Sequence, residues 1–97
     1  MKSVPEEKKP KEYFVVGNDR GLHTRPSTEL VKCASSYRAH IFLTYQKQRV
    51  DAKSLLGVLM LGASKGAKVR IEAEGEDAAE AIESIIVLAK HNFYIKY

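Results

Sequence analysis

The sequence is poor in cysteine, tryptophan and proline, and it lacks a long hydrophobic run. Its 97 residues include one cysteine (Cys33), three prolines and no tryptophan. A single cysteine excludes an intrachain disulfide, which fits a reducing compartment such as the cytoplasm. No apolar run reaches the roughly 20 residues of a membrane-spanning helix, and no apolar stretch of a signal peptide follows the charged N-terminus. We therefore expect one small cytoplasmic domain.

The charge is moderately basic and evenly distributed. The formal net charge is +4 and the sequence pI is about 9.2, with 44% hydrophobic residues. The positive charge forms no block and is compatible with a nucleic-acid, membrane-surface or acidic protein partner. We favour an acidic protein partner over nucleic acid, chiefly because of the motif described below. The three histidines, His23, His40 and His91, do not have metal-ligand spacing. We expect neither a metal nor a cofactor, and we interpret His40 and His91 as structural.

One histidine lies where a helix is expected to start. His23 is followed by Thr24, Arg25 and Pro26, and proline is tolerated in the first turn of a helix. Helical i, i+3, i+4, i+7 spacing then links Ser27, Leu30, Val31 and Ala34. His23 is thus predicted at a helix N-terminus, where backbone amides and the helix dipole favour phosphate. Arg25 offers a further fork of donors, so residues 24–26 are the predicted phosphate-binding region.

These residues also carry a family resemblance. The stretch 21–28, GLHTRPST, resembles the phosphohistidine signature of HPr, the phosphocarrier family of the bacterial phosphotransferase system, and 51–62, DAKSLLGVLMLG, is similar to that family's regulatory-serine signature. The resemblance covers roughly 12–91. It implies that His23 accepts a phosphoryl group on Nδ1 from enzyme I, stabilised by Arg25, and passes it to enzyme IIA domains. It also implies a monomeric carrier rather than a self-standing enzyme.

The second signature contains an unusual short helix. Ser54 is a suitable N-cap, but the following residues to Leu61 leave no polar face. Spacing places Leu55, Leu56 and Leu59 on one side, so the helix is either an exposed docking surface or simply well buried. The resemblance favours partner docking and implies that Ser54 is the target of an HPr kinase/phosphorylase. A phosphate there would add about two negative charges beside the apolar side chains.

The pattern of elements predicts an α+β fold. A leader is expected over 1–11 and one domain over 12–97. Period-2 and period-3.6 patterns give the order β-α-β-β-α-β-α, with strands near 13–16, 39–45, 49–51 and 68–74 and helices near 24–36, 54–62 and 77–89. The resemblance implies an open-faced sandwich, a four-stranded antiparallel sheet with three helices on one face.

Several features remain open at this level. Asp77 with Glu80 three residues later predicts an arrangement close to a capping box. The aromatic tail 91–97 either packs back on the domain or binds another molecule. Arg20 either adds charge beside His23 or points into solvent. The rival functions are a regulatory member of the same family and a basic RNA-binding or adaptor module.

Overall fold

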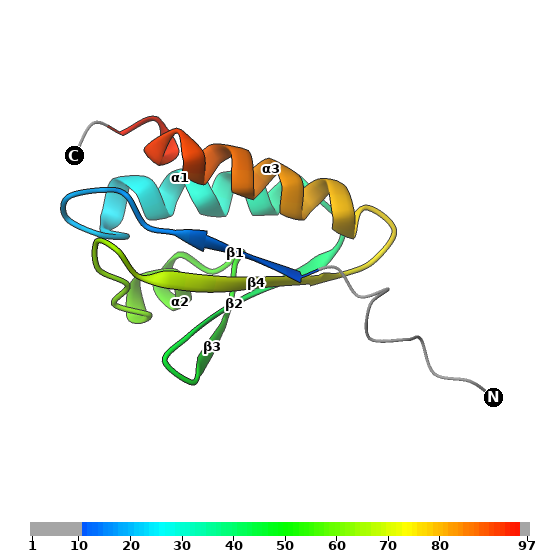
Figure 1. The fold of residues 1–97 in the computed structure, drawn as a ribbon. Coiled ribbons are helices and arrows are strands. Elements are labelled where there is room, and N and C mark those ends of the chain that lie inside the picture. The colour runs from blue at the N-terminus through cyan, green and yellow to red at the C-terminus, as the bar shows by residue number, and fades with distance from the viewer. Residues whose placement is uncertain (1–10, 96–97) are drawn as a thin grey trace.

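The structure, a computed structural model, describes residues 11–95 of the chain. Residues 1–10 of the expected leader therefore lie outside the described part, while Lys11 already belongs to the first strand. The elements follow one another as β1 Lys11–Val15, α1 Thr24–Ser35, β2 His40–Tyr45, β3 Gln48–Asp51, α2 Leu55–Met60, β4 Lys68–Glu74, α3 Ala78–Lys90 and the 3-10 turn η2 Asn92–Tyr94 (Figure 1).

The four strands form one sheet in the order β1-β4-β2-β3, and all neighbours are antiparallel. Helices α1 and α3 lie side by side over one face of this sheet (Figure 1). The short helix α2 packs against α1 and β3. This is the expected α+β architecture of a four-stranded antiparallel sheet with three helices, so the predicted fold class is confirmed.

The core lies between the sheet and the two long helices. Alternate strand residues point inward and are almost fully buried, namely Phe14, Ile41, Leu43, Val69 and Ile71. They meet one face of each long helix, formed by Leu30 and Ala34 of α1 and by Ala81, Ile82 and Ile85 of α3. The buried residues recur every second position in the strands and about every 3.6 positions in the helices, and together they form one apolar layer. No helix within residues 11–95 has the length and apolar character needed to cross a bilayer.

The start of α3 differs from the expectation. Asp77 is the N-cap residue, but its side chain makes no capping hydrogen bond. Its carboxylate instead accepts hydrogen bonds from the backbone N–H groups of Arg38 at 2.9 Å and Ala39 at 2.8 Å. The predicted capping box is therefore wrong, because the carboxylate is engaged by the chain that connects α1 to β2.

The aromatic tail packs back on the domain as far as it is described. Phe93 is fully buried, and its ring meets the Phe14 ring edge-on, with centroids 6.0 Å apart. Asn92, Phe93 and Tyr94 have φ angles of 53°, 57° and 60°, a left-handed conformation that costs about 1–2 kcal/mol for each non-glycine residue. Burying a phenylalanine side chain contributes about 1.5–3 kcal/mol, so the Phe93 contact offsets much of that strain.

Candidate functional site

His23 occupies the N-terminus of α1, as the sequence predicts. It is the N-cap residue, its backbone is extended, and its side chain is half-buried. The first intrahelical bond runs from Ser27 N to the His23 carbonyl oxygen at 3.0 Å. The amides of Thr24 and Arg25 precede that bond and face the helix N-terminus. Because the first turn contains no acidic residue, no carboxylate there opposes the positive end of the helix dipole.

The residues next to His23 divide into exposed and buried ones. Thr24 and Arg25 are exposed, whereas Pro26 is buried. Ser27 is also buried, and its Oγ donates a hydrogen bond of 2.9 Å to the carbonyl oxygen of Leu22. The structure thus brings His23, Thr24 and Arg25 into one helical turn at the surface. Pro26 and Ser27 hold that turn against the core.

The loop before His23 is fixed by a tight turn and a close backbone approach. Gly21 N donates to the Asn18 carbonyl oxygen at 2.9 Å, and Leu22 N donates to the Ala63 carbonyl oxygen at 2.8 Å. Gly21 has a φ of +70°, and a Cβ atom placed there would lie 2.4 Å from the Ala63 oxygen. Only glycine fits both the backbone angle and the space. Arg20 is an exposed residue of the same turn.

Ser54 lies at the N-terminus of α2, as expected. It is the N-cap residue, and its half-buried Oγ accepts a 3.0 Å hydrogen bond from Gly57 N. Neighbouring Lys53 extends elsewhere, because its Nζ donates to the Tyr37 carbonyl oxygen at 2.7 Å. A Cβ on Gly57 would come within 3.3 Å of both Ser54 Oγ and Val50 Cβ. The glycine therefore allows α2 to pack closely on β3.

Helix α2 exposes an apolar surface that only partly matches the expectation. Leu56 is 70% exposed, Met60 63% and Leu55 38%, whereas Leu59 is half-buried and Val58 fully buried. We call Leu55, Leu56 and Met60 the α2 patch. Sequence reasoning missed Met60, although its i+4 spacing from Leu56 would have placed both on one face.

The α2 patch and His23 belong to one part of the molecule. Helix α2 packs against α1. After α2 the chain passes through Gly62 to Ala63, whose carbonyl oxygen holds the amide of Leu22, the residue before His23. The chain that follows α2 is therefore in direct contact with the loop that leads to the start of α1.

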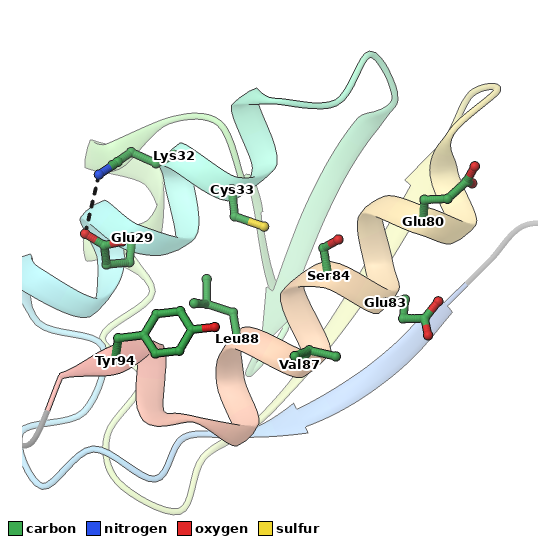
Figure 2. Close-up of a pocket in the computed structure, with 9 residues that line it drawn as sticks. All are labelled: Glu29, Lys32, Cys33, Glu80, Glu83, Ser84, Val87, Leu88 and Tyr94. Atoms are coloured by element: carbon green, nitrogen blue, oxygen red, sulfur yellow. Dashed lines mark ion pairs between the residues drawn. The ribbon is translucent and has the colours of Figure 1, made fainter.

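The groove between α1 and α3 is a different kind of surface. Its lining includes three carboxylates, Glu29, Glu80 and Glu83, against one cation, Lys32, which forms an ion pair with Glu29 at 3.7 Å (Figure 2). This excess of negative charge repels phosphate. Cys33 also lines the groove, and burial raises the pKa of its thiol, which disfavours the nucleophilic thiolate. In residues 11–95 no cluster of three or more His, Cys, Asp or Glu side chains is arranged to hold a metal ion.

Comparison with known proteins identifies relatives across almost the whole chain. Residues 10–91 match the family model described as the PTS HPr component phosphorylation site. A crystal structure of HPr-C-His from Thermoanaerobacter tengcongensis is 33% identical, with a TM-score of 0.86 over 91% of this chain and 99% of that one. The phosphocarrier protein HPr from Bacillus anthracis is 32% identical, with a TM-score of 0.78 over 81% and 94%. The catabolite repression protein Crh from Bacillus subtilis, described as a swapped dimer, is 32% identical, with a TM-score of 0.69 over 77% and 86%.

Proposed function

The chain belongs to the HPr family of phosphocarrier proteins, and we propose that His23 is the residue that carries the phosphoryl group. In this proposal enzyme I, charged by phosphoenolpyruvate, transfers the group to the Nδ1 atom of His23. The protein then passes it to an enzyme IIA domain. It acts as a covalent intermediate in the cytoplasm and does not turn over a substrate alone.

The observation that supports this assignment is the position of His23 at the start of α1. A phosphorylated imidazole places a dianion next to the positive end of the helix, in a turn without an acidic residue. Arg25 lies two residues further in the same exposed turn, and its guanidinium geometry suits phosphate oxygens. The helix end and Arg25 thereby stabilise the phosphorylated state without providing a base that activates water.

The α2 patch is the surface on which we propose that enzyme I and enzyme IIA dock. Transfer between two histidines requires an in-line approach, so a flat apolar surface beside the acceptor suits it better than a deep pocket. Leu55, Leu56 and Met60 provide such a surface on α2, and the chain that follows α2 is hydrogen-bonded to the loop before His23. The interfaces are expected to be small and transient, and the carrier is proposed to act as a monomer.

We further propose that phosphorylation of Ser54 regulates this transfer. Its Oγ already lies at the N-terminus of α2, where a phosphate is tolerated by the helix. Leu55 and Leu56 follow it directly and are exposed. The added charge would therefore face the docking partner and slow transfer to His23 without changing the histidine. An HPr kinase/phosphorylase is the enzyme class that this proposal requires.

A second role within the same family is regulation rather than sugar uptake. This role is a candidate because the chain is 32% identical to the catabolite repression protein of Bacillus subtilis. The two roles differ in the step after acceptance. The sugar-uptake role requires transfer of the phosphoryl group from His23 to an enzyme IIA domain of a sugar transporter, so failure of that transfer in vitro would favour the regulatory role.

Phosphorylation in vitro tests the central assignment. The full chain is incubated with labelled phosphoenolpyruvate and enzyme I and is then treated with acid, which removes phosphohistidine and leaves phosphoserine intact. We expect acid-labile labelling of the wild type and none of His23→Ala. His40→Ala is the matched control, since His40 is an exposed histidine at the start of β2. Labelling of the His23→Ala protein would refute the assignment, and salt-dependent RNA binding without any labelling would favour the adaptor module.

A further inference from the structure

A buried asparagine connects the loop before His23 to the C-terminal segment. Asn18 is only 2% exposed. Its Nδ2 donates hydrogen bonds to the carbonyl oxygens of Asn92 at 2.9 Å and Ile95 at 3.3 Å, which lie 74 and 77 positions away in the sequence. A buried side-chain amide is costly unless it is hydrogen-bonded. The loop and the tail are therefore specific partners.

The backbone conformation of the tail lets it pack on this loop. Asn92, Phe93 and Tyr94 all adopt left-handed backbone angles, and such strain persists only where the surroundings enforce it. Phe93 is fully buried against Phe14. The Asn92 side chain lies on Gly17, because a Cβ there would be 2.4 Å from its Oδ1. Residues 92–95, which we call the C-terminal strap, thus rest on Gly17 and Asn18 together.

The same asparagine also controls the turn that leads to His23. While its side chain holds the C-terminal strap, its carbonyl oxygen accepts the Gly21 N–H at 2.9 Å. Gly21 is followed by Leu22, whose amide is held by Ala63, and then by His23. Asn18 is therefore the point at which the C-terminal strap meets the turn that precedes His23.

We propose that the C-terminal strap is a positioning element for phosphoryl transfer, with Asn18 and Phe93 as its positioning residues. This inference rests on the proposed function of His23. Neither residue touches the reacting atoms. Their role is to restrict the turn 18–21, so that the imidazole meets the partner histidine in line. Transfer is sensitive to such geometry, since a misplacement of about 1 Å can cost about a hundredfold in rate.

The test compares two variants that disturb the C-terminal strap with one control variant at the opposite end of α3. Asn18→Ala removes the side-chain amide and keeps the Asn92 carbonyl bonded to Ile95 N at 3.0 Å, so the chain is expected to fold. Phe93→Leu loosens the same strap from the core side. Asp77→Asn is the matched control, because Asp77 lies at the start of α3, at the other end of the helical layer (Figure 1). All three are measured for melting temperature, His23 ring signals by NMR, and initial rate of labelling by enzyme I.

We expect Asn18→Ala and Phe93→Leu to shift the His23 ring signals and to slow labelling by about tenfold. We expect Asp77→Asn to lower the melting temperature but to leave both His23 readouts unchanged. Equal labelling rates and unshifted ring signals in the two strap variants overturn the inference, as does an equal loss in Asp77→Asn. If the wild type itself is not labelled, the proposed function fails. The ring signals then still report whether the strap positions His23.

Discussion

Replacing Gly21 by alanine tests how rigidly the loop before His23 is held. Gly21 has a φ of +70°, and an added Cβ would lie 2.4 Å from the Ala63 carbonyl oxygen and 2.8 Å from Ser64 Cα. The backbone angle alone costs about 1–2 kcal/mol for a residue with a Cβ. The contact is with backbone atoms that cannot rotate away, and such overpacking costs a further 1–3 kcal/mol, roughly. We therefore expect a loss of about 2–5 kcal/mol in the free energy of unfolding.

Gly62→Ala is the control for the backbone angle. Gly62 has a φ of +62°, but no atom lies within 4 Å of the position that a Cβ would take. Alanine there meets the left-handed strain alone, so we expect a loss of about 1–2 kcal/mol. Urea unfolding of both variants and the wild type measures the difference. That difference reports the cost of the close approach between Gly21 and Ala63.

The same pair of variants separates stability from transfer. Relief of the Gly21 contact requires Ala63 or the loop to move, which disturbs the 2.8 Å hydrogen bond between Leu22 N and Ala63 O. Because His23 is the next residue, labelling of Gly21→Ala by enzyme I is expected to fall about tenfold. Labelling of Gly62→Ala is expected to be unchanged. If the two variants lose the same free energy and label at the same rate, the loop is not held as the contacts indicate.

Two further predictions concern Ser54 and Asp77. Ser54→Asp is expected to slow labelling of His23, whereas Ser54→Asn is expected to leave the labelling rate unchanged. Serine, aspartate and asparagine all cap helices well, so the two variants differ only in the charge beside the α2 patch. Equal labelling rates for the two variants would refute charge repulsion at this surface. The N–H of Arg38, with that of Ala39, lowers the pKa of Asp77 in the folded state. Its carboxylate therefore stabilises the fold above the unfolded pKa of about 3.9, and this contribution is lost as the pH falls through the folded pKa. In urea unfolding, Asp77→Asn is expected to be less stable than the wild type at neutral pH, and the difference in unfolding free energy is expected to narrow as the pH falls from about 5 through about 3.9 and on through the lower folded pKa. A difference that stays constant between about pH 5 and about pH 2 would contradict this.

Local patterns were sufficient for most of the helices and strands, whereas the four-stranded antiparallel arrangement was predicted from the family resemblance. The helix predicted near 24–36 is α1, Thr24–Ser35, and the strand predicted near 68–74 is β4, Lys68–Glu74. Both have strict periodicity that also matches their burial, since Leu30 and Ala34 face the core in α1, as do Val69 and Ile71 in β4. The position of His23 at a helix start follows from the same pattern together with Pro26.

The wrong capping box and the undecided aromatic tail both involve contacts between distant parts of the chain. Asp77 with Glu80 has the sequence of a local capping box, but the Asp77 carboxylate binds backbone amides 38 and 39 positions earlier. Whether the aromatic tail packs on the domain could not be predicted, because its contact with Asn18 joins residues 74 positions apart. The Met60 omission is of a different kind: α2 is apolar throughout, so it has no polar face to mark the exposed side, and only the i+4 spacing from Leu56 links Met60 to the exposed residues. Periodicity detects only neighbours within a few turns.

In the proposed function, the reactivity of His23 depends on both local and distant parts of the chain. The stretch around His23 provides the helix start and Arg25, which are local properties. In our proposal the direction of the imidazole depends on Gly21, next to Leu22, whose amide is bonded to Ala63, and on Asn18, which is bonded to the C-terminal strap. A chain with the same motif but a different tail would therefore retain an acceptor histidine while losing one of its two anchors. Differences in transfer rate between such chains should follow the residues at 18 and 93 rather than the motif itself.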